Sequence, residues 1–283
     1  MPAVATPLEW RINGLKLAGM AWGQPDNPPL LALHGWLDNA ASYTSIAPLL
    51  EQYYLVAVDL TGHGRSDCRS ADASYNIWDD LPELVGVLDE LGWTRFRLMG
   101  HSRGAIISCL LASVMPERIE RLVLLDGVLP EPVEGDLFPA QMRTFLDQKQ
   151  HWMRRQNRIY PSVEAAVASR TAGSLPKAAV QLLVERNLRP CEGGYTWTTD
   201  LRLRGASAVK LSAGQMQAIL GAISAPTLLL LAEEGPGKQR DVAGRAAEYI
   251  RQLQVAHIAG GHHFHMEPGA AIVAQQISQF LQS

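Results

Sequence analysis

The chain has 283 residues, of which 47% are hydrophobic and 19% are charged, a balance typical of a globular protein with a sizeable core. This composition excludes intrinsic disorder. The 25 lysines and arginines stand against 28 aspartates and glutamates, and the net charge of −3 excludes the basic excess that favours nucleic acids or anionic membranes.

Residues 1–10 predict no signal peptide, because they hold neither a basic segment nor an apolar stretch after it. The longest apolar run, around residues 228–232, is too short for a membrane span. Cys68, Cys109 and Cys191 lie far apart without a CxxC pair, which argues against a zinc knuckle or a disulfide framework. We therefore expect a cytoplasmic protein.

The first predicted elements form an antiparallel hairpin followed by alternating strands and helices. Residues 8–12 and 15–22 flank Asn13-Gly14, and both residues of such a turn tolerate the positive φ it requires. Near-continuous apolar strands that alternate with helices indicate a parallel sheet covered on both faces. The apolar runs lie at residues 30–33, 54–58, 96–99, 122–125, 227–231 and 255–258, and the amphipathic segments at 77–91, 105–115 and 271–281.

This alternation is interrupted between residues 128 and 224. No buried strand is predicted there, and four segments have helical patterns: residues 141–155, 163–170, 177–187 and 214–223. A helical insertion of about a hundred residues between two strands is better explained as a cap than as a linker. We predict a core of residues 1–127 and 225–283 and a helical cap of residues 128–224.

The segment Gly100-His-Ser102-Arg-Gly104 matches the motif G-x-S-x-G between a predicted strand and a predicted helix. In this arrangement the serine lies on a strained turn, and the flanking glycines let strand and helix pack closely. The serine Oγ then projects near a helix N-terminus, whose dipole favours developing negative charge. This context favours Ser102 as a nucleophile over a purely structural turn.

Acyl transfer also needs backbone N–H groups that stabilise an oxyanion. The N–H of Arg103 directly follows the serine, and the N–H of Trp36 after the third predicted strand is the second candidate. Gly35 allows a substrate to approach closely, and we expect His34 to shape this loop. Trp36 and Arg103 are therefore the predicted oxyanion hole.

A general base must accompany the serine, and the chain has eight histidines. His262 follows a glycine pair after the last predicted strand and is favoured over His263 and His265. The clustered histidines also suggest zinc, but their spacing in a loop gives no favoured ligand geometry and no Cys or Asp cluster accompanies them. We predict no metal and no cofactor.

These motifs resemble those of the serine-type α/β-hydrolase family, and the similarity extends over nearly the whole chain. The matching segments are residues 34–36, 59–66, 100–104 and 261–262. Residues 34–43, 125–127 and 261–267 are similar to the serine-hydrolase-like subgroup. The resemblance implies an α/β fold with a mostly parallel eight-stranded sheet flanked by helices and a helical cap inserted after strand 6.

The family also implies a triad in the chain order serine, acid, histidine. In most relatives the acid follows the seventh strand, but the expected position here falls on Gly235. Some members place the acid at the end of the sixth strand, where Asp126 stands. We expect Asp126 to orient the imidazole and stabilise the imidazolium, with Glu234 as the alternative acid and loop capping as the alternative role of Asp126.

Two groups of cap residues have open interpretations. Four aromatic residues either line an acyl pocket or form the core of the cap: Trp152, Tyr160, Tyr195 and Trp197. Three charged residues are expected on a solvated face or in an internal ion pair: Asp200, Arg202 and Arg204.

The sequence thus predicts a cofactor-free serine hydrolase that acts on a small to medium carboxylic ester or thioester. A carbon–carbon bond hydrolase with the same triad is a close variant, whereas epoxide hydrolases carry an aspartate where this chain has Ser102. The other classes are a non-catalytic α/β-hydrolase-fold binding protein and a lyase or cofactor-free oxygenase. A small-molecule acyl substrate is the expected partner, without nucleic acid or membrane insertion, and a monomer and a homodimer both fit.

Overall fold

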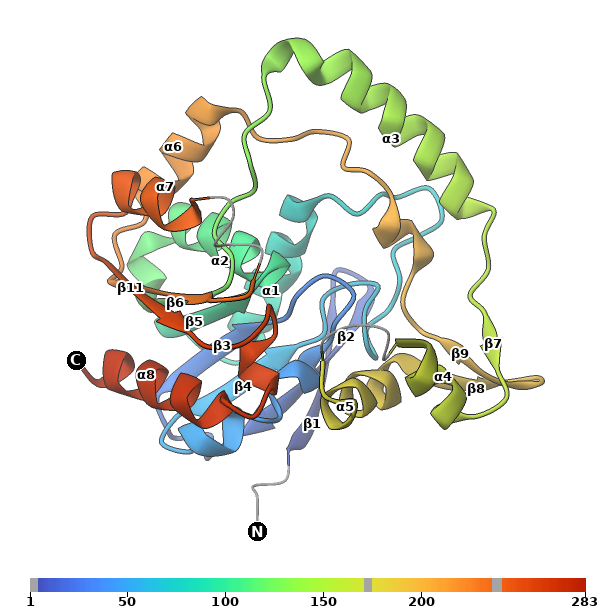
Figure 1. The fold of residues 1–283 in the computed structure, drawn as a ribbon, viewed down its shortest axis with the longest axis horizontal. Coiled ribbons are helices and arrows are strands. Elements are labelled where there is room, and N and C mark those ends of the chain that lie inside the picture. The colour runs from blue at the N-terminus through green and yellow to red at the C-terminus, as the bar shows by residue number, and fades with distance from the viewer. Residues whose placement is uncertain (1–4, 171–174, 236–240) are drawn as a thin grey trace.

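The computed structural model describes residues 5–170, 175–235 and 241–283. Its centre is an eight-stranded sheet with the strand order β1-β2-β4-β3-β5-β6-β10-β11 (Figure 1). The strands are β1 (Thr6–Ile12), β2 (Leu15–Trp22), β3 (Pro29–Leu33), β4 (Tyr54–Val58), β5 (Phe96–His101), β6 (Ile119–Leu125), β10 (Thr227–Ala232) and β11 (Leu253–Ile258). The pairs β1–β2 and β2–β4 are antiparallel and the other five pairs of this sheet are parallel, so the predicted mostly parallel sheet is confirmed.

The predicted hairpin joins β1 to β2. Ile12 pairs with Leu15, and the turn residues Asn13 and Gly14 have φ angles of 53° and 81°. Both angles lie in the left-handed region that asparagine and glycine tolerate best. The local sequence therefore determines this turn.

Two apolar layers cover the sheet, because successive residues of a strand point to opposite faces. In β3, Leu31 and Leu33 join one buried cluster, whereas Leu30 and Ala32 join the other. The first cluster includes residues of α1 (Asp80–Glu90), α2 (Arg103–Val114), α6 (Ala213–Ala222) and α7 (Val242–Tyr249). The second cluster includes residues of α8 (Ala270–Gln282), which lies on the opposite side of the sheet (Figure 1).

The segment between β6 and β10 contains helices at the four predicted positions. They are α3 (Phe138–Met153), α4 (Val163–Arg170), α5 (Lys177–Asn187) and α6. In α6, Met216 and Leu220 belong to the same buried cluster as α2, so this helix packs on the core. The domain boundaries at residues 127 and 225 stay a prediction.

The expectation of an all-helical insertion is wrong in one respect. A small three-stranded sheet has the order β7-β9-β8, formed by β7 (Ile159–Tyr160), β9 (Gly194–Trp197) and β8 (Leu188–Cys191). These strands are two to four residues long and mostly not buried, so they lack the apolar runs that reveal a core strand.

Within the described residues, no helix combines the length and the hydropathy needed to cross a membrane.

A buried ion pair joins α5 to the core. Arg186 donates through Nε to both carboxylate oxygens of Asp59, at 3.0 Å each, and through Nη2 to the carbonyl of Gly19 at 3.2 Å. Asp59 is fully buried and also accepts the N–H groups of Ala40 and Arg65, at 2.8 Å each. Because a buried charge is costly without its partner, this pair ties the insertion to the loop after β4.

We expect Arg186→Met to lower the free energy of unfolding by about 3–5 kcal/mol, because the Asp59 carboxylate would stay buried without its counter-charge. Urea denaturation at pH 7 measures this change. The control Arg189→Met changes an exposed arginine of β8 and should alter the stability by no more than about 0.5 kcal/mol. Equal stabilities of the two variants would contradict the prediction.

Candidate active site

Ser102 lies on the turn between β5 and α2 in a strained conformation. Its φ is 51° and its ψ is −113°, a region that residues with a side chain rarely adopt. A Cβ at Gly104 would lie 2.0 Å from the carbonyl oxygen of Leu33, and a Cβ at Gly100 would lie 2.4 Å from that of Gly104. The two motif glycines therefore allow the helix, the strand and the loop after β3 to meet at this turn.

The structure brings the three predicted triad residues into one hydrogen-bonded chain. His262 Nε2 lies 2.9 Å from Ser102 Oγ, and His262 Nδ1 lies 2.5 Å from Asp126 Oδ2. A carboxylate only accepts hydrogen bonds, so Nδ1 carries the proton and Nε2 presents its lone pair to the serine hydroxyl. This is the arrangement that general-base activation of a serine requires.

Asp126 reaches His262 from the end of β6. Its carboxylate is buried, and its Oδ1 accepts the N–H of Ala232 at 3.1 Å. A Cβ at Gly235 would lie 2.4 Å from Asp126 Oδ2, so the carboxylate occupies space that a side chain at Gly235 would fill. The alternative acid, Glu234, is exposed. The absence of a side chain at Gly235, after β10, therefore leaves the space that the carboxylate of Asp126, after β6, occupies.

The two predicted oxyanion donors lie on neighbouring parts of the site. Arg103 is the first residue of α2, where a backbone N–H has no acceptor within its own helix. Its side chain forms an ion pair with Asp80 at 2.8 Å, and burial raises the pKa of Asp80 to about 6 against the opposing charge of Arg103. Trp36 lies on the loop after β3 and is 50% exposed. Both residues line the cavity that contains Ser102.

The loop that carries Trp36 is held by His34. His34 Nε2 accepts the N–H of Leu60 at 3.0 Å, and Nδ1 donates to the carbonyl of Gly35 at 2.8 Å. Burial lowers the pKa of His34, which keeps the ring neutral and suits it to accept from a backbone amide. These contacts fit the loop-shaping role expected for His34.

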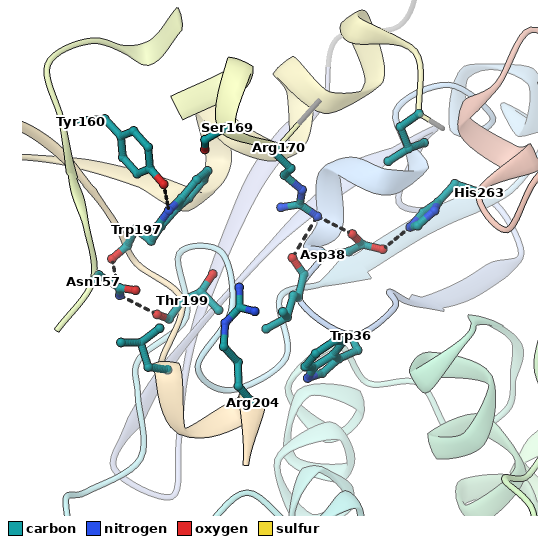
Figure 2. Close-up of a pocket in the computed structure, with 13 residues that line it drawn as sticks. Trp36, Asp38, Asn157, Tyr160, Ser169, Arg170, Trp197, Thr199, Arg204 and His263 are labelled. Carbon is teal, nitrogen blue, oxygen red and sulfur yellow. Dashed lines mark hydrogen bonds and ion pairs between the residues drawn. The ribbon is translucent and has the colours of Figure 1, made fainter. Parts of the chain in front are cut away.

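Trp36 lines two cavities. The cavity of about 690 Å³ contains Ser102 and Arg103, and its apolar lining includes Ile77, Trp78, Ile106, Val133, Leu203 and Leu211. The cavity of about 440 Å³ is lined in part by the cap residues Tyr160, Trp197 and Arg204 (Figure 2). The indole N–H of Trp36 donates to the carbonyl of Leu203 at 2.9 Å, which fixes the orientation of the side chain.

The structure resolves part of the open interpretation of the cap residues. Tyr160 and Trp197 line the smaller cavity and lie within hydrogen-bond distance of each other, at 3.3 Å. Asp200 and Arg202 form an ion pair at 2.6 Å, one of the two arrangements expected for this charged group. Arg204 is exposed and lines the smaller cavity.

A second polar network behind the triad was missed by sequence reasoning. Asp38 Oδ2 accepts from His263 Nε2 at 3.0 Å, and Asp38 Oδ1 accepts from Arg170 at 2.8 Å (Figure 2). Burial alone would raise the pKa of Asp38, but the hydrogen bond from His263 and the charge of Arg170 hold it well below its ordinary value. His263, an alternative base, thus binds Asp38, and the other alternative, His265, is buried against the ring of His101.

Two members of this network lie within or near the motifs predicted from the sequence, but no motif connects them. His101 lies inside the serine motif, and Asp38 lies two residues after Trp36. His101 Nε2 donates to the backbone carbonyl of His262 at 2.9 Å, so it supports the loop that carries the predicted base. Only the fold reveals this contact, because 161 positions separate the two residues.

The central sheet, the strained serine turn and the Ser102–His262–Asp126 arrangement together define an α/β hydrolase. A model of the family described as alpha/beta hydrolase fold matches residues 28–269, and the chain belongs to this family. The predicted resemblance and fold class are thereby confirmed.

The chain is similar to three known proteins over nearly its whole length. A serine hydrolase-like protein of Danio rerio is 30% identical over an alignment of 289 residues, which covers 98% of this chain and 87% of the relative. The structure of a hypothetical protein from Pseudomonas aeruginosa is 37% identical, has a TM-score of 0.90 and covers 97% of both chains. A thioesterase domain from the curacin biosynthetic pathway is 29% identical, with a TM-score of 0.84 and coverage of 97% and 99%.

The glycine at position 235 provides a test of the site geometry. We expect Gly235→Ala to displace the Asp126 carboxylate from His262 and to slow modification of Ser102 by a fluorophosphonate about 10²-fold or more, as loss of general-base catalysis does. Intact mass spectrometry over time gives the rate. The control Gly221→Ala adds a methyl group where no atom lies within 4 Å, and it should react like the wild type. Equal rates for the two variants would refute the packing argument.

Proposed function

We propose that the protein is a serine hydrolase that cleaves a small to medium carboxylic ester or thioester through an acyl-enzyme on Ser102. The observation that carries this proposal is the continuous hydrogen-bonded chain from Ser102 Oγ through His262 to Asp126. Its serine opens into a cavity of about 690 Å³, a size typical of small-molecule sites. The similarity to a thioesterase domain supports an acyl substrate.

In the proposed reaction, Ser102 Oγ attacks the carbonyl carbon of the substrate while His262 Nε2 takes the hydroxyl proton. The N–H groups of Trp36 and Arg103 stabilise the negative charge on the carbonyl oxygen, and Asp126 stabilises the imidazolium. The imidazolium then donates its proton to the departing alkoxide or thiolate. A water molecule, activated in turn by His262, attacks the acyl-enzyme and releases the carboxylic acid and the free serine.

The apolar lining of the larger cavity favours a substrate whose acyl group has substantial apolar surface. Ile77 and Trp78 directly precede α1, Ile106 lies in α2, and Leu203 and Leu211 come from the segment between β6 and β10. Burial of apolar substrate surface against them contributes about 25 cal/mol per Å² before the costs of association. We therefore expect activity to rise with acyl chain length until the cavity is filled.

We expect Ser102→Ala to abolish covalent labelling by a fluorophosphonate and to slow ester hydrolysis about 10³-fold or more, because no other group replaces the nucleophile. Intact mass spectrometry should show one adduct on the wild type and none on the variant. A folded wild-type protein that forms no adduct would contradict the proposal and favour a binding protein.

We expect Asp126→Asn to lower kcat for a p-nitrophenyl ester about 10²- to 10⁴-fold, because the amide no longer stabilises the imidazolium. Glu234→Gln removes the competing, exposed carboxylate and should leave kcat unchanged. Steady-state kinetics of both variants at pH 7 decides between the two acids, and a large effect of Glu234→Gln alone would overturn the assignment to Asp126.

A further inference from the structure

We propose that Asp38, His101 and His263 form a binding site for a divalent transition metal ion, such as Zn²⁺, directly behind the Ser102–His262–Asp126 chain. Each residue offers one ligand atom, and the three atoms lie within 4.8 Å of one another. Asp38 Oδ2 is 3.0 Å from His263 Nε2 and 3.8 Å from His101 Nδ1. Ligands placed about 2.0–2.2 Å from a tetrahedral zinc ion lie about 3.3–3.6 Å apart, so side-chain movements of about 1 Å would seat an ion.

The His101 ring presents a free lone pair to this site. Its Nε2–H donates to the carbonyl of His262 at 2.9 Å, so Nδ1 is the unprotonated nitrogen. His101 is fully buried, and among the described residues its Nδ1 has no hydrogen-bond partner. This nitrogen faces Asp38 Oδ2, which is also an acceptor. Two buried acceptors that face each other are stabilised by a cation between them, and imidazole and carboxylate are common ligands of such ions.

The surrounding contacts orient the ligands. Arg170 binds Asp38 Oδ1 at 2.8 Å and balances part of the carboxylate charge. The ion would replace the hydrogen bond between Asp38 Oδ2 and His263 Nε2, with the imidazole proton carried on Nδ1 instead. The carbonyl of His262 orients the ring of His101 in the same way as the outer contacts of known metal sites. Such contacts hold the ligands in place before an ion arrives.

The site also has a route to solvent. Asp38 and His263 line the cavity of about 440 Å³, and Figure 2 shows their side chains directed toward each other beside Arg170. An ion can enter through this cavity, and a water molecule from it can complete a four-coordinate shell.

An ion at this position would connect the loop of Asp38 with the loop of His263. The positive charge would lie next to His262 and would disfavour the imidazolium that acyl transfer requires. Metal binding should therefore inhibit the reaction. This consequence, unlike the metal site itself, rests on the proposed hydrolase function.

Isothermal titration calorimetry with Zn²⁺ tests the site on the chelator-treated, dialysed 283-residue chain. We expect one ion per wild-type chain and an affinity lower by about 100-fold or more for His263→Gln, beyond the usual effect of an outer contact. Glutamine keeps a donor near Asp38 but removes the imidazole ligand. The matched control His257→Ala removes an exposed histidine of β11 and should bind like the wild type, as should Ser102→Ala.

Absence of zinc binding to the wild type, or binding unchanged in a folded His263→Gln protein, would overturn the site. Fluorophosphonate labelling then tests the inhibition, which should be reversed by a chelator and be absent in His263→Gln. Zinc binding without slower labelling would overturn the inhibition alone. A wild type that never labels would refute the hydrolase function, and calorimetry would still decide the metal site.

Discussion

The contact between α2 and the loop after β3 is the constraint on which the rest of the site depends. Gly104 approaches the carbonyl of Leu33 so closely that a Cβ would lie 2.0 Å from its oxygen. This approach brings the turn of Ser102 beside the loop that carries Trp36. The strained φ of 51° at Ser102 lies in the same packed region, on the turn between the buried strand β5 and α2, and such a conformation persists only where the surrounding structure holds it.

A second constraint links the strand ends to the choice of acid. A carboxylate can reach His262 Nδ1 from the end of β6 or from the loop after β10, but the space holds only one. Here Asp126 fills it and position 235 is a glycine. In the sequence, the missing acid at position 235 and the aspartate at position 126 are two unrelated observations. The structure connects them, because a side chain at position 235 would clash with the carboxylate of Asp126.

The predictable parts of the molecule are those with a local or periodic signal. The hairpin at Asn13-Gly14, the buried strands and the serine turn all have such signals, and the structure contains each of them. The strands around Tyr160 and Trp197 are too short to show one. The contact between Asp38 and His263 joins residues 225 positions apart, so no local pattern encodes it. Which cap residues line the cavities depends in the same way on the packing of the insertion.

Trp36 connects the two cavities, because it contributes to the lining of both. Its indole is fixed to the carbonyl of Leu203 by a single hydrogen bond of 2.9 Å. A side chain, unlike the backbone around it, can adopt another rotamer. Rotation of the indole would cost one hydrogen bond, about 0.5–1.5 kcal/mol, and would change the lining of both cavities at once. A bulky ligand in one cavity can therefore alter the shape of the other through a single torsion angle.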